Sequence, residues 1–266
     1  MKETEDADAR IWRSHVGSGP LVATAVHDGH DARDEVAKHF ALDDAGRLRE
    51  EDPFTGDWAQ VAPTRVIGTR SRFEVDLNRP RDKAVYRTPS DAWGLTVWKD
   101  NPSDEMFERS LAQYDAFYDA MRILFTEISQ LHGRFVVFDL HSYNHRRNGS
   151  EGLHADPEDN PQVNIGTGTM NRQKWAPVID TLIETLRSFD FPGGKLDVRE
   201  NVKFQGGNWP RWIHENFPDE GVAIAIEFKK FFMDEWSGLP DDRHIQAIGE
   251  ALRHSGTAVI EELERL

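Results

Sequence analysis

The chain has 266 residues, a formal net charge of −15 at pH 7 and no cysteine. The acidic charge argues against a general nucleic-acid-binding protein, because phosphates are bound by basic surfaces, and the absence of cysteine excludes disulfides, thiolate zinc sites and cysteine nucleophiles. With 38% hydrophobic and 10% aromatic residues, we expect one globular domain spanning residues 1–266, large enough to bury its own core.

The N-terminal segment MKETEDADARIW is acidic and lacks the apolar stretch of a signal peptide. The longest apolar runs hold about ten residues, roughly half of what crosses a bilayer. We therefore expect a cytoplasmic protein that does not associate with membranes.

Predicted strands and helices alternate along the chain. Short apolar runs predict strands at 20–27, 70–79, 134–141 and 221–228. In the strand at 70–79, apolar residues alternate with polar ones, which predicts that only one of its faces is buried. Helical spacing of apolar residues predicts helices at 31–42, 103–133 and 175–191, with one or two more over 241–266. This order predicts an α/β fold, with a mixed, mostly parallel sheet and helices on both faces.

Chemically active side chains lie at or near the ends of the predicted strands. In such sheets, sites gather at the carboxyl ends of strands. The side chains in question are His27, Asn78, His141 and Glu227. They make this edge of the sheet the expected location of the site.

Two histidines, His27 and His141, each follow a predicted buried strand. One such histidine alone is more often a hydrogen-bonded structural residue, but two in equivalent positions favour a metal site. Without sulfur ligands, hydrolytic zinc typically takes two histidines and one carboxylate, leaving a position for water. Several other divalent metals also accept nitrogen and oxygen ligands.

The third metal ligand has several candidates. They are Asp28, His30, Asp31, Glu50, Glu51 and Asp52. Spacing alone does not choose among them. We expect Asp139 to point away from His141 in an alternating strand, and so to orient a ligand rather than bind the metal.

The segment FEVDLNRPRD at 73–82 places Arg79 beside Asn78. A guanidinium fixed by a following proline offers a planar fork to a substrate carboxylate, and Arg72 is a second candidate for this role. The structural alternative is a salt bridge from Arg79 to Asp76 or Asp82.

Glu227 is the acid within the apolar run VAIAIEFKKFF at 222–232. An unpaired buried carboxylate is costly. It therefore either pairs with Lys229 or an arginine, or it acts as a general base with a raised pKa.

The chain resembles the N-formylglutamate amidohydrolase family, which is related to zinc carboxypeptidases and aspartoacylases. The resemblance covers roughly residues 20–238 and rests on four motifs in the expected order: SRFEVDLNRP at 71–80, FDLHSYN at 138–144, VNIGT at 163–167 and IAIEFKKFFMDEWSG at 224–238. It implies a three-layer, zinc-carboxypeptidase-like α/β fold.

The resemblance also implies a one-zinc site with His27 and His141 as ligands. Relatives in the carboxypeptidases carry the acidic ligand three residues after the first histidine, where this chain has His30. The segment EDPFT at 51–55 looks like the family's acidic segment, so Asp52 is the expected third ligand, with Glu51 and His30 as alternatives.

The other site residues follow from the same resemblance. Asn78 and Arg79 match the family's carboxylate-binding pair, and Glu227 matches the catalytic glutamate that takes a proton from water and delivers it to the leaving amine. The turn VHDGH at 26–30, where relatives have a PHSG-like turn, departs from the family pattern. Two longer segments also depart from it, AWGLTVW at 92–98 and GGNWPRWIHENFP at 206–218, and these departures indicate a different substrate pocket.

Three functions are consistent with these motifs. The first is zinc-dependent hydrolysis of the amide bond of an N-formyl or N-acyl amino acid. The second is a carboxypeptidase-like activity on short peptides, and the third is a binding or regulatory role in a family member that has lost its metal. A closed pocket around Arg79, Trp93 and Trp98 would favour small acyl amino acids over peptides.

Overall fold

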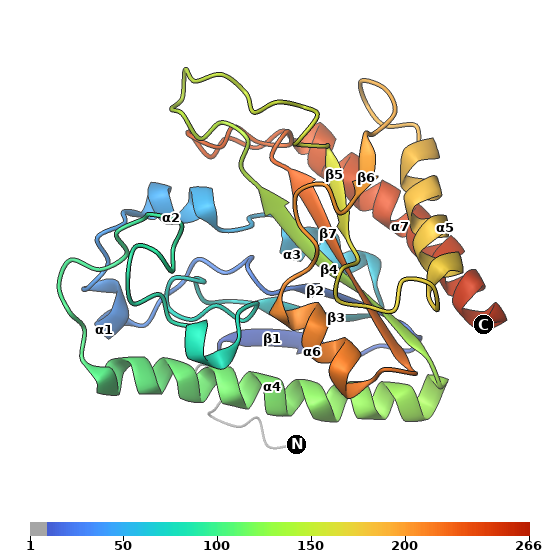
Figure 1. Cartoon of the computed structure of the whole chain (residues 1–266), viewed down its shortest axis with the longest axis horizontal. Coiled ribbons are helices and arrows are strands. Elements are labelled where there is room, and N and C mark those ends of the chain that lie inside the picture. Colours follow the sequence, from blue (N-terminus) through green and yellow to red (C-terminus); the bar gives the residue numbers. More distant parts are fainter. Residues whose placement is uncertain (1–9) are drawn as a thin grey trace.

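The computed structural model describes residues 10–266. The acidic residues 1–9, which begin the segment used above to argue against a signal peptide, lie outside the described part. The chain forms one seven-stranded sheet in the order β1-β3-β2-β4-β7-β5-β6 (Figure 1). The strands are β1 Trp12–His15, β2 Leu21–Ala25, β3 Thr64–Gly68, β4 Phe135–Tyr143, β5 Val163–Gly166, β6 Val198–Glu200 and β7 Gly221–Lys229.

Most neighbouring strands in the sheet are parallel. β2 is parallel to β3 and β4, β4 is parallel to β7, and β5 is parallel to β6. Only β1 with β3 and β5 with β7 pair in the antiparallel sense. The predicted mixed, mostly parallel sheet is confirmed.

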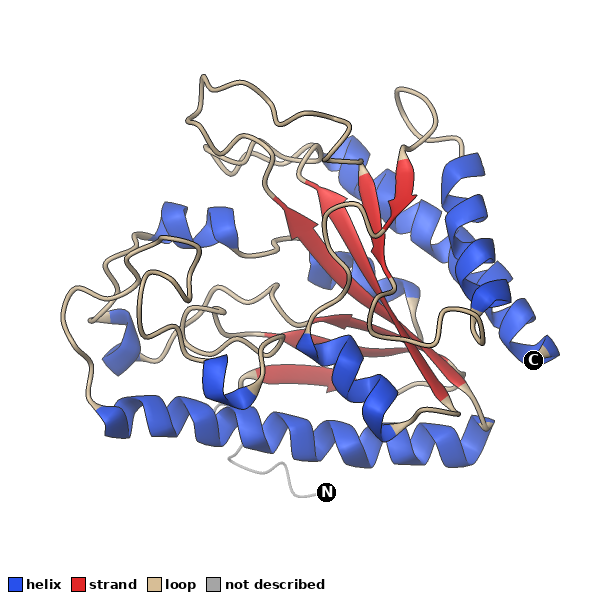
Figure 2. Ribbon diagram, viewed as in Figure 1, coloured by secondary structure: helices blue, strands red, loops and turns tan. Residues whose placement is uncertain are grey.

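Helices cover both faces of the sheet (Figure 2). The α-helices are α1 Asp34–Ala37, α2 Asp44–Glu50, α3 Thr55–Trp58, α4 Asp104–His132, α5 Ala176–Ser188, α6 Asn208–Asn216 and α7 Asp242–Arg265, and two short 3-10 turns cover Ala59–Val61 and Arg81–Lys83. One core cluster packs the sheet against α5 and α7, and the other packs it against α4 and α6. The three-layer architecture follows.

The central strand β4 shows why both faces are buried. Its residues alternate between the two cores: Val136 and Phe138 face the α5 and α7 side, whereas Phe135 and Val137 face the α4 and α6 side. All nine residues of β4 are buried, and burial of both faces explains why its first four residues, FVVF, are a continuous apolar run.

The predicted strand at 70–79 is wrong. Residues 72–74 and 77–78 form turns rather than a strand, and the backbone groups of this segment bond locally: Asp76 N–H donates to the carbonyl of Ala84, and Asn78 N–H donates to the Asp76 carboxylate. Phe73, Val75 and Leu77 are buried in the α4 and α6 core, which explains their strand-like alternation. Asn78 therefore lies in a loop rather than at a strand end.

One helix prediction needs adjustment: the helix expected over 31–42 is the single turn α1 Asp34–Ala37. The C-terminal segment, expected to hold one or two helices, is one helix, α7. The long helix is confirmed as α4, because Ser103 caps its first turn by accepting from Met106 N–H and Gly133 follows its end. None of the helices in residues 10–266 is long and apolar enough to span a bilayer.

Candidate metal centre and substrate cleft

The site lies where β4 and β7 extend beyond the shorter strand β2. His141 of β4 and Glu227 of β7 are register partners, so their side chains lie side by side on the face toward α4 and α6. His27 follows two residues after the end of β2. Three strands of the central sheet thus direct these groups to one place, at the carboxyl ends of parallel strands.

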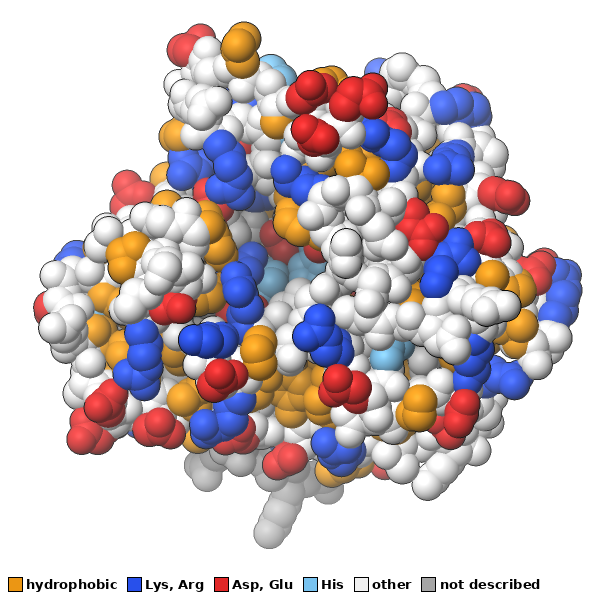
Figure 3. Space-filling view, in the orientation of Figure 1, with side chains coloured by type: hydrophobic (Ala, Val, Ile, Leu, Met, Phe, Trp, Pro, Cys, Tyr) orange, Lys and Arg blue, Asp and Glu red, His pale blue; other side chains and the backbone are white. Residues whose placement is uncertain are grey.

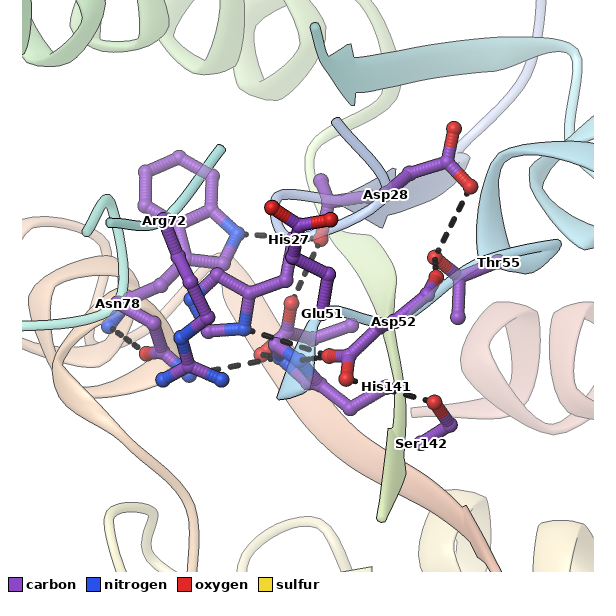
Figure 4. Close-up of polar contacts among 12 residues, drawn as sticks. His27, Asp28, Glu51, Asp52, Thr55, Arg72, Asn78, His141 and Ser142 are labelled. Atoms are coloured by element: carbon purple, nitrogen blue, oxygen red, sulfur yellow. Dashed lines mark hydrogen bonds and ion pairs between the residues drawn. The ribbon is translucent and has the colours of Figure 1, made fainter. Parts of the chain in front are cut away.

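Asp52 is carried by the loop between α2 and α3. Its backbone N–H donates to the carbonyl of His27 at 3.0 Å, and Thr55 Oγ1 donates to the Asp52 carbonyl at 2.6 Å. These bonds place Asp52 Oδ2 between two imidazoles, 3.3 Å from His27 Nδ1 and 2.9 Å from His141 Nδ1 (Figure 4). Ser142 Oγ donates to the other carboxylate oxygen at 3.3 Å.

The second nitrogen of each imidazole faces a further carboxylate. His27 Nε2 lies 2.7 Å from Asp76 Oδ1, and His141 Nε2 lies 3.0 Å from Asp139 Oδ2. The expectation that Asp139 points away from His141 is wrong, because residues two apart in a strand share a face. Thr24 Oγ1 fixes Asp139 by donating to Oδ1 at 3.0 Å.

His27, Asp52 and His141 fit a metal ion. Their potential ligand atoms all lie within 4.8 Å of one another, and all three residues are buried. Metal-binding histidines are typically oriented by a carboxylate that accepts from the second ring nitrogen, and Asp76 and Asp139 occupy this position behind the two imidazoles. Although burial alone raises the pKa of Asp52, its contacts with His141 and His27 hold that pKa below its ordinary value, so the carboxylate is ionised as a ligand must be.

The rival ligands from the sequence lie elsewhere. Glu51 Oε2 lies 2.6 Å from His30 Nδ1, and Ser71 Oγ donates to the other oxygen of Glu51. Asp28 accepts the Gly56 N–H at 2.8 Å. Among the candidate acids, Asp52 is the one that the structure brings to both histidines.

Glu227 stands beside this cluster without a cation of its own. Within residues 10–266, no ion pair or hydrogen bond engages its carboxylate, and Lys229 Nζ instead donates to the carbonyl of Asn160 at 2.8 Å. Burial raises the pKa of Glu227 to about 7; the neighbouring Asp52 and Asp139 charges add to this rise, whereas His141 opposes it. A carboxyl group with such a pKa can exchange protons near neutrality.

The two candidate arginines have different surroundings. Arg72 Nη2 donates to Asp76 Oδ2 at 2.7 Å, and its Nε donates to Tyr86 Oη at 3.2 Å, so it supports the carboxylate behind His27. The guanidinium of Arg79 lies 5.8 Å from the centre of the Tyr86 ring and makes no ion pair within the described residues. The salt bridge considered for Arg79 is absent, and its guanidinium can bind a substrate anion.

Asn78 links the centre to the start of α6. Its Nδ2 lies 3.4 Å from His141 Nε2, while its Oδ1 accepts the Trp209 N–H at 2.8 Å. Gly207 is required here, because a Cβ at this position would lie 2.2 Å from Asn78 Oδ1. The side chain of Asn78 is therefore held in place before any substrate binds.

A cleft of about 700 Å³ opens above these groups. Its lining contains more basic than acidic side chains, although the protein as a whole is acidic. The basic side chains are Arg72, Arg79, Arg147, Lys203, Arg211 and Lys230. Figure 3 shows histidines at the floor of a hollow, with basic side chains around its edge. This lining favours an anionic ligand.

Several residues of the site are not predicted from the sequence. Asp76, which lies behind His27, enters the sequence analysis only as a possible partner for Arg79. Arg147, Lys203 and Lys230, which line the cleft, carry no recognisable signal. Both segments that departed from the family pattern do line the cleft, through Trp93 and through the start of α6. Trp98 does not, because it stacks on Phe40.

Comparisons with known proteins bear on the family and on the fold. The family model for N-formylglutamate amidohydrolase matches residues 19–233. The crystal structure of N-formylglutamate amidohydrolase from Ralstonia eutropha JMP134 is similar, with a TM-score of 0.73 and 15% identity over 96% of this chain and 98% of that one. No curated protein matches the sequence.

Two further structures show likeness. A gene product from Agrobacterium tumefaciens has a TM-score of 0.67 and 18% identity, over 99% of this chain and all of that one (100%). A metallo-carboxypeptidase from Burkholderia cenocepacia has a TM-score of 0.38 and 14% identity, over 91% of this chain and 57% of that one.

Proposed function

Because the chain belongs to the N-formylglutamate amidohydrolase family, we propose that it is a metal-dependent hydrolase that cleaves the amide bond of an N-formyl or N-acyl amino acid. The observation that carries this proposal is the buried group of His27, Asp52 and His141 with Glu227 beside it, at the floor of a basic cleft. Metal ligands, a proton acceptor and an anion-binding residue then face one cavity.

We assign His27, Asp52 and His141 as the metal ligands. Two nitrogens and one carboxylate oxygen are a typical ligand set of hydrolytic zinc, although other divalent metals accept it. A bound zinc ion would supply Lewis acidity, which polarises a carbonyl oxygen and makes water a better nucleophile near neutral pH. Asp76 and Asp139 hold the two imidazoles in the orientation that ligation needs.

Glu227 is the proposed general base. Its carboxylate takes a proton from the attacking water and passes that proton to the amine that leaves. A pKa of about 7 suits both halves of this transfer, because the group gains and loses a proton with similar ease at neutral pH.

Arg79 is the proposed anchor for the substrate carboxylate. A guanidinium without an internal partner offers paired N–H donors to a carboxylate, and it fixes the scissile amide relative to Glu227. Asn78 adds an amide donor on the same side of the cleft, whereas Arg72 contributes indirectly by holding Asp76.

A release assay tests this function. Chelator-treated protein is incubated with N-formyl, N-acetyl and short peptide substrates, before and after one equivalent of zinc is restored. We expect amine release from acyl amino acids only after metal is restored, and at least a hundredfold less from Glu227→Gln. Metal-independent turnover, or a Glu227→Gln variant of near wild-type rate, would contradict the mechanism.

The same panel separates the alternative functions. Preferred cleavage of peptides would indicate a carboxypeptidase-like enzyme. A protein that binds acyl amino acids but hydrolyses none, with or without metal, would indicate a non-catalytic family member. The ionised Asp52 between two oriented imidazoles favours the enzyme over this last alternative.

A further inference from the structure

Lys230 is a buried charged residue without a part in the mechanism above. Only 1% of its surface is exposed. Its Nζ donates to the carbonyls of Arg49 at 2.5 Å and Glu51 at 2.7 Å. Burying an ammonium group is costly even when it is hydrogen-bonded, so such a group calls for an explanation.

The two carbonyls lie at the C-terminal end of α2, directly before Asp52. The last carbonyls of a helix lack partners within the helix, and a cation is favoured at this end of the helix dipole. Lys230 therefore caps α2 and fixes the point at which the chain leaves the helix toward Asp52.

The other side of Lys230 is fixed to the sheet. The residue directly follows β7, and its backbone N–H donates to the carbonyl of Tyr143, the last residue of β4, at 3.0 Å. β4 carries His141 and β7 carries Glu227. Lys230 is thus a short physical link between the two strands of the site and the loop that carries Asp52.

We propose that Lys230 is a positioning residue that holds Asp52 between His27 and His141 so that the three can bind a metal ion. The inference rests on the proposed metal centre. Asp52 belongs to no strand. Its own backbone N–H and carbonyl are bonded to His27 and to Thr55, but these bonds do not hold the residues that precede it. The bonds from Lys230 fix the segment before it.

The direction in which metal affinity changes when Lys230 is replaced distinguishes a positioning role from a purely electrostatic one. An ammonium group near a metal ion repels the ion, so removal of its charge alone would tighten metal binding. Loss of the link to α2 would instead release Asp52 and weaken metal binding. Lys229 provides a matched control, because it is the adjacent lysine and its Nζ donates to Asn160, away from the Asp52 segment.

The experiment compares Lys230→Met, Lys229→Met and the wild type by calorimetric titration of the metal-free proteins with Co²⁺. The visible absorption spectrum of each Co²⁺ complex reports ligand geometry independently of catalysis. We expect Lys230→Met to bind Co²⁺ at least tenfold more weakly with altered absorption bands, in line with other residues that orient ligands, and Lys229→Met to match the wild type. Thermal melting without metal checks folding.

Each outcome has a distinct meaning. Equal or tighter Co²⁺ binding by Lys230→Met, with a wild-type spectrum, would overturn the positioning role and leave the proposed function standing. A wild type that binds no Co²⁺ would overturn the metal centre and this inference with it. Should Lys230→Met not fold, Lys230→Leu, which likewise carries no donor, is titrated in its place with the same criterion.

Discussion

In the metal-free protein, the ionisation of Glu227 should make stability depend on pH. Burial raises its pKa from the ordinary 4.5 to about 7, and the charges on Asp52 and Asp139 add to the rise. The folded state therefore binds more protons than the unfolded state between these two values. The contribution of Glu227 to the free energy of unfolding falls as pH rises through this window. Glu227→Gln removes the effect because glutamine does not ionise.

The size of this effect follows from the two pKa values. A rise from 4.5 to about 7 corresponds to roughly 3 kcal/mol at pH values above both. The side chain is partly exposed to the cleft, and solvent screening reduces the expected effect to about 2 kcal/mol.

Urea unfolding of chelator-treated protein measures this effect. The free energy of unfolding of Glu227→Gln, relative to the wild type, should increase by about 2 kcal/mol between about pH 5 and about pH 8. Glu127→Gln, at an exposed position of α4, is the control and should show no such trend. Saturating zinc should weaken the trend, since a nearby cation favours the carboxylate. A difference between Glu227→Gln and the wild type that does not change with pH would refute the reasoning.

Further substitutions test the assigned roles. Asp52→Ala should weaken zinc binding at least tenfold in calorimetric titration, while Glu51→Gln should change it little; equal effects would refute the choice of ligand. Arg79→Met should raise KM for acyl amino acids about tenfold, whereas Arg81→Met, which loses only exposed ion pairs with Glu108 and Asp115, should not; an unchanged KM in Arg79→Met would remove its role as anchor. Trp93→Ala should raise the ratio of kcat/KM for bulky over small acyl groups, and a constant ratio would show that Trp93 does not limit the pocket.

Much of the fold can be predicted from the sequence because its central strands β4 and β7 begin with continuous apolar runs. The predicted strands at 134–141 and 221–228 agree with β4 and β7 within two residues at each end. The segment 71–79 misled because Phe73, Val75 and Leu77 alternate, yet they pack into a core without joining the sheet. Alternating apolar and polar residues indicate that one side of a segment is buried. Here a series of turns, rather than a strand, buries the apolar side chains.

The candidate site depends on tertiary contacts that spacing does not reveal. His141 and Glu227 meet through strand register, and Asp52 reaches His27 through one backbone hydrogen bond across 25 positions. Lys230 lies two residues after the predicted strand 221–228, and its bonds to the end of α2 depend on how that helix docks. The family motifs supplied the residue types, and the structure supplied their arrangement.

The zinc content of the wild type and of His141→Ala, measured after zinc loading and removal of free metal, tests the central claim most directly. The wild type should retain about one equivalent of zinc, and His141→Ala should retain almost none while its metal-free form keeps the folded circular dichroism spectrum. A wild type that retains no zinc, or a variant that retains as much as the wild type, would contradict the proposed metal centre.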